Sequence, residues 1–195
     1  MKLMLIAGEA SGDVHGSAIL SELRGLDPEL TALGIGGRRM MEQGLRPCFM
    51  LDSLQVHGML ELLRHLPRLY RTLWMMEKAL SVERPDALLL IDYPGFNLKL
   101  AACARRLGIP VIFFNSPQVW AWRKGRLKTI RQNVDLMLVL FPFETRIYEQ
   151  SDVEVRCVGH PLLDERVDET QLKNFREEYA IEQGQKVLML APGSR

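Results

Sequence analysis

Short apolar runs alternate along this chain with longer segments in which polar and apolar residues mix. The apolar run at residues 87–91 is short and lies between Pro85-Asp86 and Pro94-Gly95, which is typical of a strand buried on both faces. We predict strands at residues 2–7, 30–35, 44–51, 87–91, 111–114, 134–140 and 153–158. The mixed segments predict helices at residues 13–26, 97–107, 142–150 and 171–179, and a short helix that follows Gly36 and Gly37 and ends at Gln43.

Strands that alternate with helices in this way predict an α/β protein, with a Rossmann-like parallel sheet flanked by helices. Residues 1–183 are predicted to form the N-terminal domain. A fresh apolar run at 186–191 leads into Pro192-Gly193-Ser194-Arg195, so residues 184–195 are predicted to be the first strand and turn of a second, truncated domain.

The run at 87–91 is predicted to be the central strand, and it ends at Asp92. In open parallel sheets ligands bind beyond the carboxyl ends of the strands, so Asp92 lies where chemistry is expected. An alternative is that Asp92 only caps the helix that starts near Asn97, or closes the turn.

The amino-acid composition is that of an ordinary globular protein and indicates no particular function. The chain is 47% hydrophobic and 25% charged, and its formal net charge is only +1, which gives no overall reason to bind nucleic acid. Its three cysteines, Cys48, Cys103 and Cys157, are widely spaced and form no metal or disulfide pattern, which favours a reducing cytoplasm. The N-terminus is too short in its apolar part for a signal peptide, and no run approaches the ~18 apolar residues of a membrane span.

A glycine corner, Gly8-Glu9-Ala10-Ser11-Gly12, links the first strand to the first helix. Free backbone N–H groups at such a helix start attract anions, although Glu9 opposes a phosphate pressed directly on this corner. The alternative is that Ser11 is a helix N-cap and both glycines serve the turn.

Residues 56–76 have apolar side chains at helical spacing, and Pro67 is predicted to break or kink the segment into a pair of helices. Residues 55–78 carry four Lys or Arg and two Glu, so the segment is locally basic. Such a pair can lie on an anionic membrane surface or hold an acyl chain. It can equally be two helices that cover the core.

Two further loops follow predicted strands. Residues 115–124 contain Trp120, Trp122, Arg123 and Lys124, which could stack on a ligand and hold a phosphate, or pin the loop to the core. His160 could serve acid–base chemistry or bind a diphosphate, although a lone histidine beside Gly159 and Pro161 is more often structural.

Six short motifs occur in one order: A-G-E-A-S-G-D (7–13), G-I-G-G (34–37), I-D-Y-P-G-F-N (91–97), S-P-Q-V-W-A-W-R (116–123), G-H-P-L-L-D (159–164) and P-G-S-R (192–195). Together they resemble the lipid-A-disaccharide synthase family. The matches correspond to the N-terminal half of the family and the first strand of its C-terminal half.

The resemblance implies a GT-B glycosyltransferase with an acceptor-binding N-terminal domain and a donor-binding C-terminal domain. The implied reaction is the inverting transfer from UDP-2,3-diacylglucosamine to 2,3-diacylglucosamine 1-phosphate, which gives lipid A disaccharide 1-phosphate and UDP. It implies no metal and no cofactor, and places the protein in the cytoplasm, peripheral on the inner membrane. The implied partners are the acylated glucosamine 1-phosphate acceptor, the UDP-diacylglucosamine donor and the inner-membrane surface, with no nucleic acid; a second copy of the chain is a further candidate partner.

The resemblance also assigns roles to residues of this chain. Asp92 matches the aspartate for which we predict the role of base, and Glu9 is the second carboxylate candidate. The residues predicted to bind substrate are Ser11, Gly12, Asn97, Ser116, Trp120, Trp122, Arg123, His160 and Arg195. Because both implied substrates carry acyl chains, membrane or acyl contact is predicted for Val56, Met59, Leu60, Leu63, Leu66 and Leu69.

The chain departs from the family pattern at three places. Gly95 replaces a second acid in the motif that contains Asp92, His57 stands in a V-H-G where V-M-G is common, and Gln118 replaces a serine. Two other readings stay open: the chain alone could be a non-catalytic module that binds acceptor and membrane, or the parent could transfer a UDP-sugar to another lipid.

Overall fold

The computed structural model describes residues 1–50, 59–117, 125–149, 153–164, 169–182 and 184–191. These residues divide into two compact units, Met1–His160 and Pro161–Arg195. The first unit contains all of the strands described below. The predicted boundary at 183/184 lies inside the second unit and stays a prediction.

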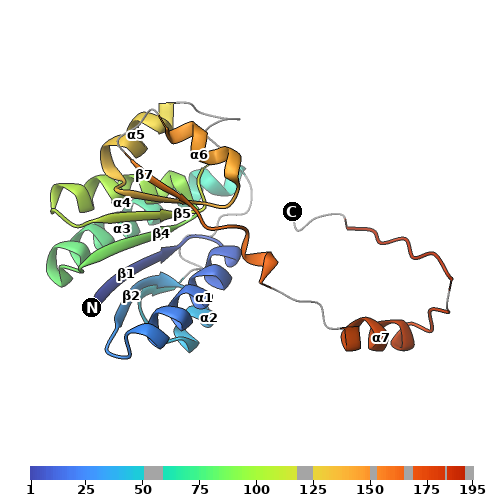
Figure 1. Cartoon of the computed structure of the whole chain (residues 1–195). Helices are drawn as coiled ribbons and strands as arrows, with labels where there is room; N and C mark the ends of the chain where they lie inside the picture. The colour runs from blue at the N-terminus through green and yellow to red at the C-terminus, as the bar shows by residue number, and fades with distance from the viewer. Residues whose placement is uncertain (51–58, 118–124, 150–152, 165–168, 183, 192–195) are drawn as a thin grey trace. The chain divides into compact units, whose positions relative to one another are not determined.

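The first unit is built on one seven-stranded parallel sheet with strand order β3-β2-β1-β4-β5-β6-β7 (Figure 1). Its strands are β1 (Lys2–Ala7), β2 (Thr31–Gly36), β3 (Leu45–Met50), β4 (Ala87–Ile91), β5 (Val111–Phe114), β6 (Leu136–Val139) and β7 (Glu154–Cys157). This confirms the predicted Rossmann-like sheet and places β4 at its centre.

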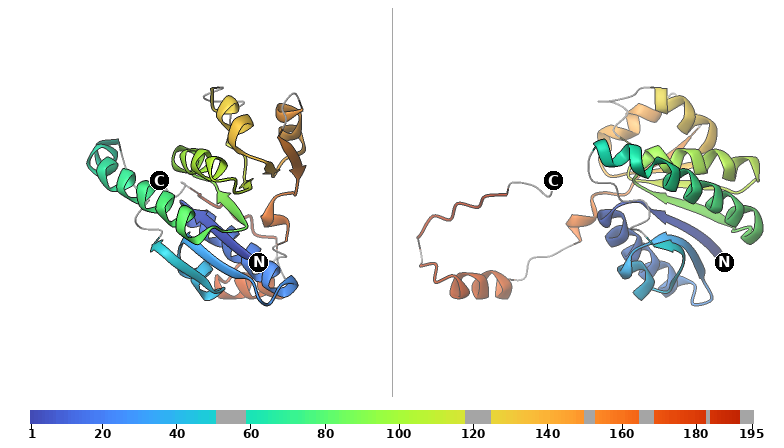
Figure 2. Two further views of the ribbon diagram at one scale, coloured as in Figure 1. Left: turned by 90° about the vertical axis from the view of Figure 1, so that its left-hand side faces the viewer. Right: turned by 180° about the vertical axis from the view of Figure 1, so that it is seen from behind.

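Helices cover both faces of this sheet (Figure 2). They are α1 (Ala10–Leu26), α2 (Arg38–Glu42), α3 (Met59–Glu83), α4 (Pro94–Arg106), α5 (Gly125–Asn133) and α6 (Pro142–Tyr148). One core cluster joins α3, α4 and α5 to the sheet, and the other joins α1 and α2 to it. In β4, Leu88 and Leu90 enter the first cluster while Leu89 and Ile91 enter the second, so both faces of the strand are buried.

The second unit holds the 3-10 turn η2 (Pro161–Leu163) and helix α7 (Glu169–Glu178). The strand predicted at 186–191 is wrong, because these residues have no regular secondary structure. A strand needs a neighbour for its backbone N–H and C=O groups, and no strand is described in this unit.

The helical predictions need three corrections. Residues 59–83 form one helix that continues through Pro67, so the predicted pair of helices is wrong. Helix α4 begins at Pro94 rather than near Asn97, because proline at the first helical position is pre-set for the helix. Helix α5 was not predicted, since its sequence G-R-L-K-T-I-R-Q-N is mostly polar and buries only Ile130.

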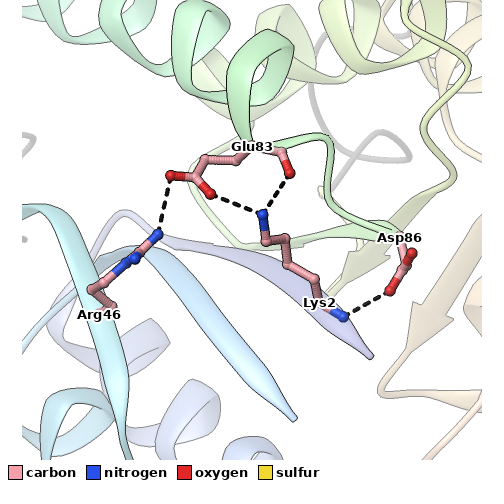
Figure 3. A network of polar contacts seen from close by, with 4 residues as sticks. All are labelled: Lys2, Arg46, Glu83 and Asp86. Atoms are coloured by element: carbon pink, nitrogen blue, oxygen red, sulfur yellow. Dashed lines mark hydrogen bonds and ion pairs between the residues drawn. The ribbon is translucent and has the colours of Figure 1, made fainter.

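A network of polar contacts holds the amino ends of the strands together (Figure 3). The Nζ of Lys2 donates to the Glu83 carboxylate at 2.9 Å and to its carbonyl at 2.7 Å, and Arg46 donates to the same carboxylate at 3.0 Å. The backbone N–H of Lys2 donates to Asp86 at 2.7 Å. The hydrogen bond from Lys2 lowers the pKa of Glu83. This network fixes the end of α3 beside β1 and β3, at the edge of the sheet opposite the candidate site.

Candidate active site

The carboxyl ends of β1 and β4 meet at the point where the strand order reverses. The chain runs outward from β1 through β2 to β3, and then crosses back to β4 on the other side of β1. Ala7 and Ile91 are partners in the β1–β4 register, so Glu9 and Asp92 both follow the last paired residues. Ligands of open α/β sheets bind at such switch points.

Asp92 lies at a tight corner between β4 and α4. Asp92 and Tyr93 have φ angles of 52° and 45°, in the left-handed region that non-glycine residues rarely adopt. The Nδ2 of the buried Asn97 donates to the carbonyls of Ile91 at 3.2 Å and Asp92 at 2.7 Å. These two hydrogen bonds from Asn97 therefore stabilise the backbone conformation of the corner.

The carboxylate of Asp92 does not cap α4. The N-cap of that helix is Tyr93, and it makes no side-chain cap hydrogen bond. Instead, Asn115 donates a hydrogen bond from Nδ2 to the Asp92 carboxylate. The helix-cap alternative for Asp92 is therefore wrong, and its carboxylate is available at the carboxyl edge of the sheet.

The surroundings of Asp92 make it a stronger base than an ordinary aspartate. Burial raises the pKa of Asp92 from 3.8 to about 6; the hydrogen bond from Asn115 lowers it and the charge of Glu9 raises it. A carboxylate with this pKa is mostly ionised at neutral pH and holds a proton more firmly than a free aspartate. These are the properties of a general base.

Glu9 occupies the neighbouring corner as the N-cap residue of α1, without a side-chain cap bond. The Ser11 cap alternative is wrong, because the helix begins at Ala10 and Ser11 lies exposed in its first turn. Gly12 is buried where a Cβ would lie 3.3 Å from the Cβ of Ala7, so it allows α1 to approach β1 and β4. Gly8 similarly leaves room for the ring of Tyr93.

Ser116 follows β5 and is buried. Its hydroxyl lies 2.7 Å from the hydroxyl of Tyr148 and donates to the carbonyl of Pro117 at 3.1 Å. Burial raises the pKa of Tyr148. His160, beyond β7, is partly buried with its ring 5.8 Å from that of Phe141.

Several predicted site residues lie outside the described residues: Val56, Trp120, Trp122, Arg123 and Arg195. The backbone of Met59, Leu60 and Leu63 belongs to α3, but the description of its side chains begins at Leu66. Their predicted roles stay predictions.

Leu66 and Leu69 line a shallow pocket between α3 and the start of α4. The pocket is completed by Tyr70, Leu73, Gly95, Phe96 and Lys99. Tyr70 and Trp74 are 57% and 54% exposed. The Nζ of Lys99 lies 4.6 Å from the Tyr70 ring centroid, and the Nζ of Lys78 lies 3.8 Å from that of Trp74. Exposed aromatic rings beside lysines therefore extend the apolar surface next to the Asp92 corner.

None of the helices in the described part of the chain is both long and apolar enough to cross a bilayer. No cluster of His, Cys, Asp and Glu suited to a metal ion occurs among those residues.

Asn115 is the site residue that the sequence reasoning missed. It is the first residue after β5, as Asp92 is the first residue after β4, and Ile91 and Phe114 are partners in the register. A polar residue directly after the neighbouring apolar run was the available signal.

Comparisons with known proteins agree with this architecture. Residues 3–195 match the family model for lipid-A-disaccharide synthetase. The chain is 45% identical over 195 residues to a lipid-A-disaccharide synthase of Geobacter sulfurreducens, covering 100% of this chain and 50% of that relative. It is 42% identical over 194 residues to one from Anaeromyxobacter dehalogenans, again covering 100% of this chain and 50% of the relative. The chain thus spans about half the length of these relatives.

Solved structures share the fold at low sequence identity. A UDP-GlcNAc 2-epimerase from Neisseria meningitidis, bound to UDP-GlcNAc, is 12% identical with a TM-score of 0.61 over 94% of this chain and 54% of its own. MurG from Acinetobacter baumannii is 15% identical with a TM-score of 0.53 over 82% of this chain and 45% of its own. These likenesses confirm the predicted Rossmann-like fold, and the match over residues 3–195 shows that the chain belongs to the lipid-A-disaccharide synthetase family.

Proposed function

We propose that the protein of full family length is an inverting glycosyltransferase of lipid A biosynthesis, in which Asp92 is the general base. The donor is a UDP-sugar, UDP-2,3-diacylglucosamine, and the acceptor is a lipid, 2,3-diacylglucosamine 1-phosphate. The observation that carries this proposal is the half-buried Asp92 carboxylate at the switch point, with its pKa raised to about 6.

The proposed step is a single displacement. Asp92 takes the proton of the acceptor 6-hydroxyl while that oxygen forms a bond to the anomeric carbon of the donor. The bond from the anomeric carbon to the diphosphate oxygen breaks, and UDP leaves with the electron pair. Attack opposite the leaving group inverts the anomeric centre, and the protonated Asp92 then releases its proton to solvent.

The proposal assigns supporting roles to the other predicted residues. Glu9 supplies the second carboxylate, and its charge adds to the larger effect of burial in raising the Asp92 pKa. The proposed acceptor contacts are Ser11, Trp120, Trp122 and Arg123. His160 and Arg195 are each proposed to bind the diphosphate of the donor. Gly12, Asn97 and Ser116, which are buried, are proposed to support the substrate site at the carboxyl ends of the strands.

The surface of α3 and α4 is proposed to take up acyl chains from the inner membrane, with the protein peripheral on its cytoplasmic face. The residues proposed for acyl or membrane contact are Val56, Met59, Leu60, Leu63, Leu66 and Leu69, of which Leu66 and Leu69 line the pocket described above. Support comes from the Leu66–Leu69 pocket, the exposed rings of Tyr70 and Trp74, and the adjacent Lys78 and Lys99. We also expect this membrane-binding protein to form a homodimer.

Turnover by the full-length protein tests the assignment of the base. Asp92→Asn is expected to lower disaccharide formation by about 10³-fold, within the range that general-base catalysis supplies, with the fold retained. Asp86→Asn is a matched control, because Asp86 is at the other end of β4. Near-normal turnover by Asp92→Asn would contradict the proposal.

A second candidate is that this 195-residue chain alone is a non-catalytic module for acceptor and membrane. The membrane part of this reading is favoured by the exposed rings of Tyr70 and Trp74 beside Lys99 and Lys78. Titration with the monosaccharide acceptor and with UDP separates the two, since the module requires acceptor binding without UDP binding or turnover. Assays of the full-length protein with other acyl-sugar acceptors test the third reading, a different lipid acceptor.

A further inference from the structure

Asn115 and Asp92 are fixed beside each other by the sheet itself. Ile91 and Phe114 are partners in the β4–β5 register, and the next residue of each strand is Asp92 and Asn115. The backbone N–H of Asp92 donates to the Phe114 carbonyl at 3.2 Å, and that of Asn115 donates to Leu138 at 3.0 Å. The ladder thus continues through both residues, which sets the separation of their Cα atoms.

The backbone of Asn115 supports the same arrangement. Its φ of 66° lies in the left-handed region, which asparagine tolerates better than most residues. From this position its Nδ2 donates to one oxygen of the Asp92 carboxylate, Oδ1. Within the described part of the chain, no hydrogen bond reaches Oδ2.

We infer that Asn115 is a positioning residue, which binds Oδ1 of Asp92 and thereby presents Oδ2 to the substrate hydroxyl. This inference rests on the proposed role of Asp92 as base. A carboxylate held by one oxygen loses rotational freedom about its terminal bond, and correct orientation of a reacting group lowers the barrier. Asn115 need not touch the substrate to have this effect.

Glu9 also acts on the charge of Asp92. Glu9 from the start of α1 raises the pKa of Asp92, and it also raises that of the adjacent Tyr93, after the larger effect of burial. His15 of α1 packs with its ring 5.7 Å from that of Phe114, the residue before Asn115. Because a hydrogen bond to a carboxylate favours its charged form, loss of the Asn115 amide raises the Asp92 pKa further.

The test is Asn115→Gly, which removes the amide and tolerates the left-handed backbone. The Asp92 carboxyl is titrated by carbon-13 NMR in the 195-residue chain, and its pKa is expected to rise by about one unit. In the full-length protein the acidic limb of the pH–rate profile should move up equally, and kcat should fall about tenfold with KM little changed.

Asn133→Gly is the matched control, because it removes an asparagine amide that bonds the Thr129 carbonyl in α5. It should leave the Asp92 titration and the rates unchanged. If Asn115→Gly does not fold, Asn115→Asp keeps the shape of the side chain and should raise the Asp92 pKa by adding a second carboxylate. An unchanged Asp92 titration in the folded variant would overturn the inference. Full turnover by Asp92→Asn would instead overturn the assignment of the base, so the two failures are distinguishable.

Discussion

The carboxylate of Asp13, in the first turn of α1, accepts a hydrogen bond of 2.7 Å from the backbone N–H of Gly37. It also accepts hydrogen bonds of 3.1 Å from the backbone N–H groups of Arg39 and Met40. Gly37 is the N-cap residue of α2 and has no side chain to cap that helix. Asp13, a buried residue of α1, therefore caps α2. Its hydrogen bonds hold the start of α2 against the first turn of α1, which follows Glu9.

Asp13→Ala is expected to lower the free energy of unfolding by about 3 kcal/mol, because it leaves buried N–H groups at the start of α2 unpaired. Urea unfolding of the 195-residue chain measures this. Glu42→Ala is the control: it removes an exposed ion pair with Arg38 in α2 and should change the free energy by less than about 0.5 kcal/mol. Equal effects of the two variants would contradict the capping role of Asp13.

Asp92 should make the folded protein less stable at neutral pH than at acid pH. Between pH 3.8 and about 6 the folded state keeps the Asp92 proton that the unfolded state has released. The free energy of unfolding contributed by this residue therefore falls as pH rises through that window, and stays low above it.

Asp92→Asn removes that pH-dependent loss. The variant should be more stable than the parent by about 1–2 kcal/mol at pH 7.5, a range reduced for the partial exposure of the carboxylate. The difference should shrink toward zero below pH 4. Thermal unfolding at several pH values checks it, with Asp86→Asn as a comparison at the opposite end of β4. A stability difference that does not depend on pH would contradict the raised pKa.

Gly95→Asp restores the acid that the resemblance leads us to expect at this position. A Cβ at Gly95 meets nothing within 4 Å among the described residues, and the position lies in the first turn of α4. Negative charge at a helix start is favourable, so the variant should gain about 0.5 kcal/mol in unfolding experiments. Turnover of the full-length variant should stay within about threefold of the parent, a change of less than 1 kcal/mol in barrier. A gain of tenfold or more would show that the absent acid limits the rate.

Ser116→Ala should destabilise the fold through Tyr148. The Tyr148 hydroxyl is buried with the Ser116 hydroxyl 2.7 Å away, so the substitution removes a hydrogen-bond partner inside the core. The expected loss is about 1–2 kcal/mol in urea unfolding. The double variant Ser116→Ala, Tyr148→Phe should recover part of the loss, because the hydroxyl that loses its Ser116 partner is then also removed. No recovery would mean that the two hydroxyls are not coupled.

The inner strands β2, β1, β4 and β5 could be predicted from sequence because their burial leaves nearly uninterrupted apolar runs. The Val111–Phe114 strand was predicted at its observed bounds, and the Lys2–Ala7 strand likewise. The continuous helix through Pro67 could not be predicted, because a proline inside a helix normally breaks or kinks it. The helix is held by tertiary packing further along, where Thr72, Met76 and Leu80 are buried. Helix α5 gave no apolar repeat to detect.

The site was predictable in part. Asp92 was evident because it ends the most apolar run in the chain, and Glu9 because it follows the first strand. Their proximity required the strand order, which places β1 next to β4 although β2 and β3 intervene in sequence. Asn115 required the register between β4 and β5, which apolar patterning alone does not specify.

The pairing of β1 with β4 also governs when the site can form during folding. Lys2 and Asp86, which meet at the start of this pair, are 84 residues apart in sequence. Closing so long a loop is entropically costly before the contacts it permits are made. Glu9 and Asp92 therefore come together only after the two halves of the sheet have joined, and a nascent chain that has not yet emerged beyond β4 contains one carboxylate without the other.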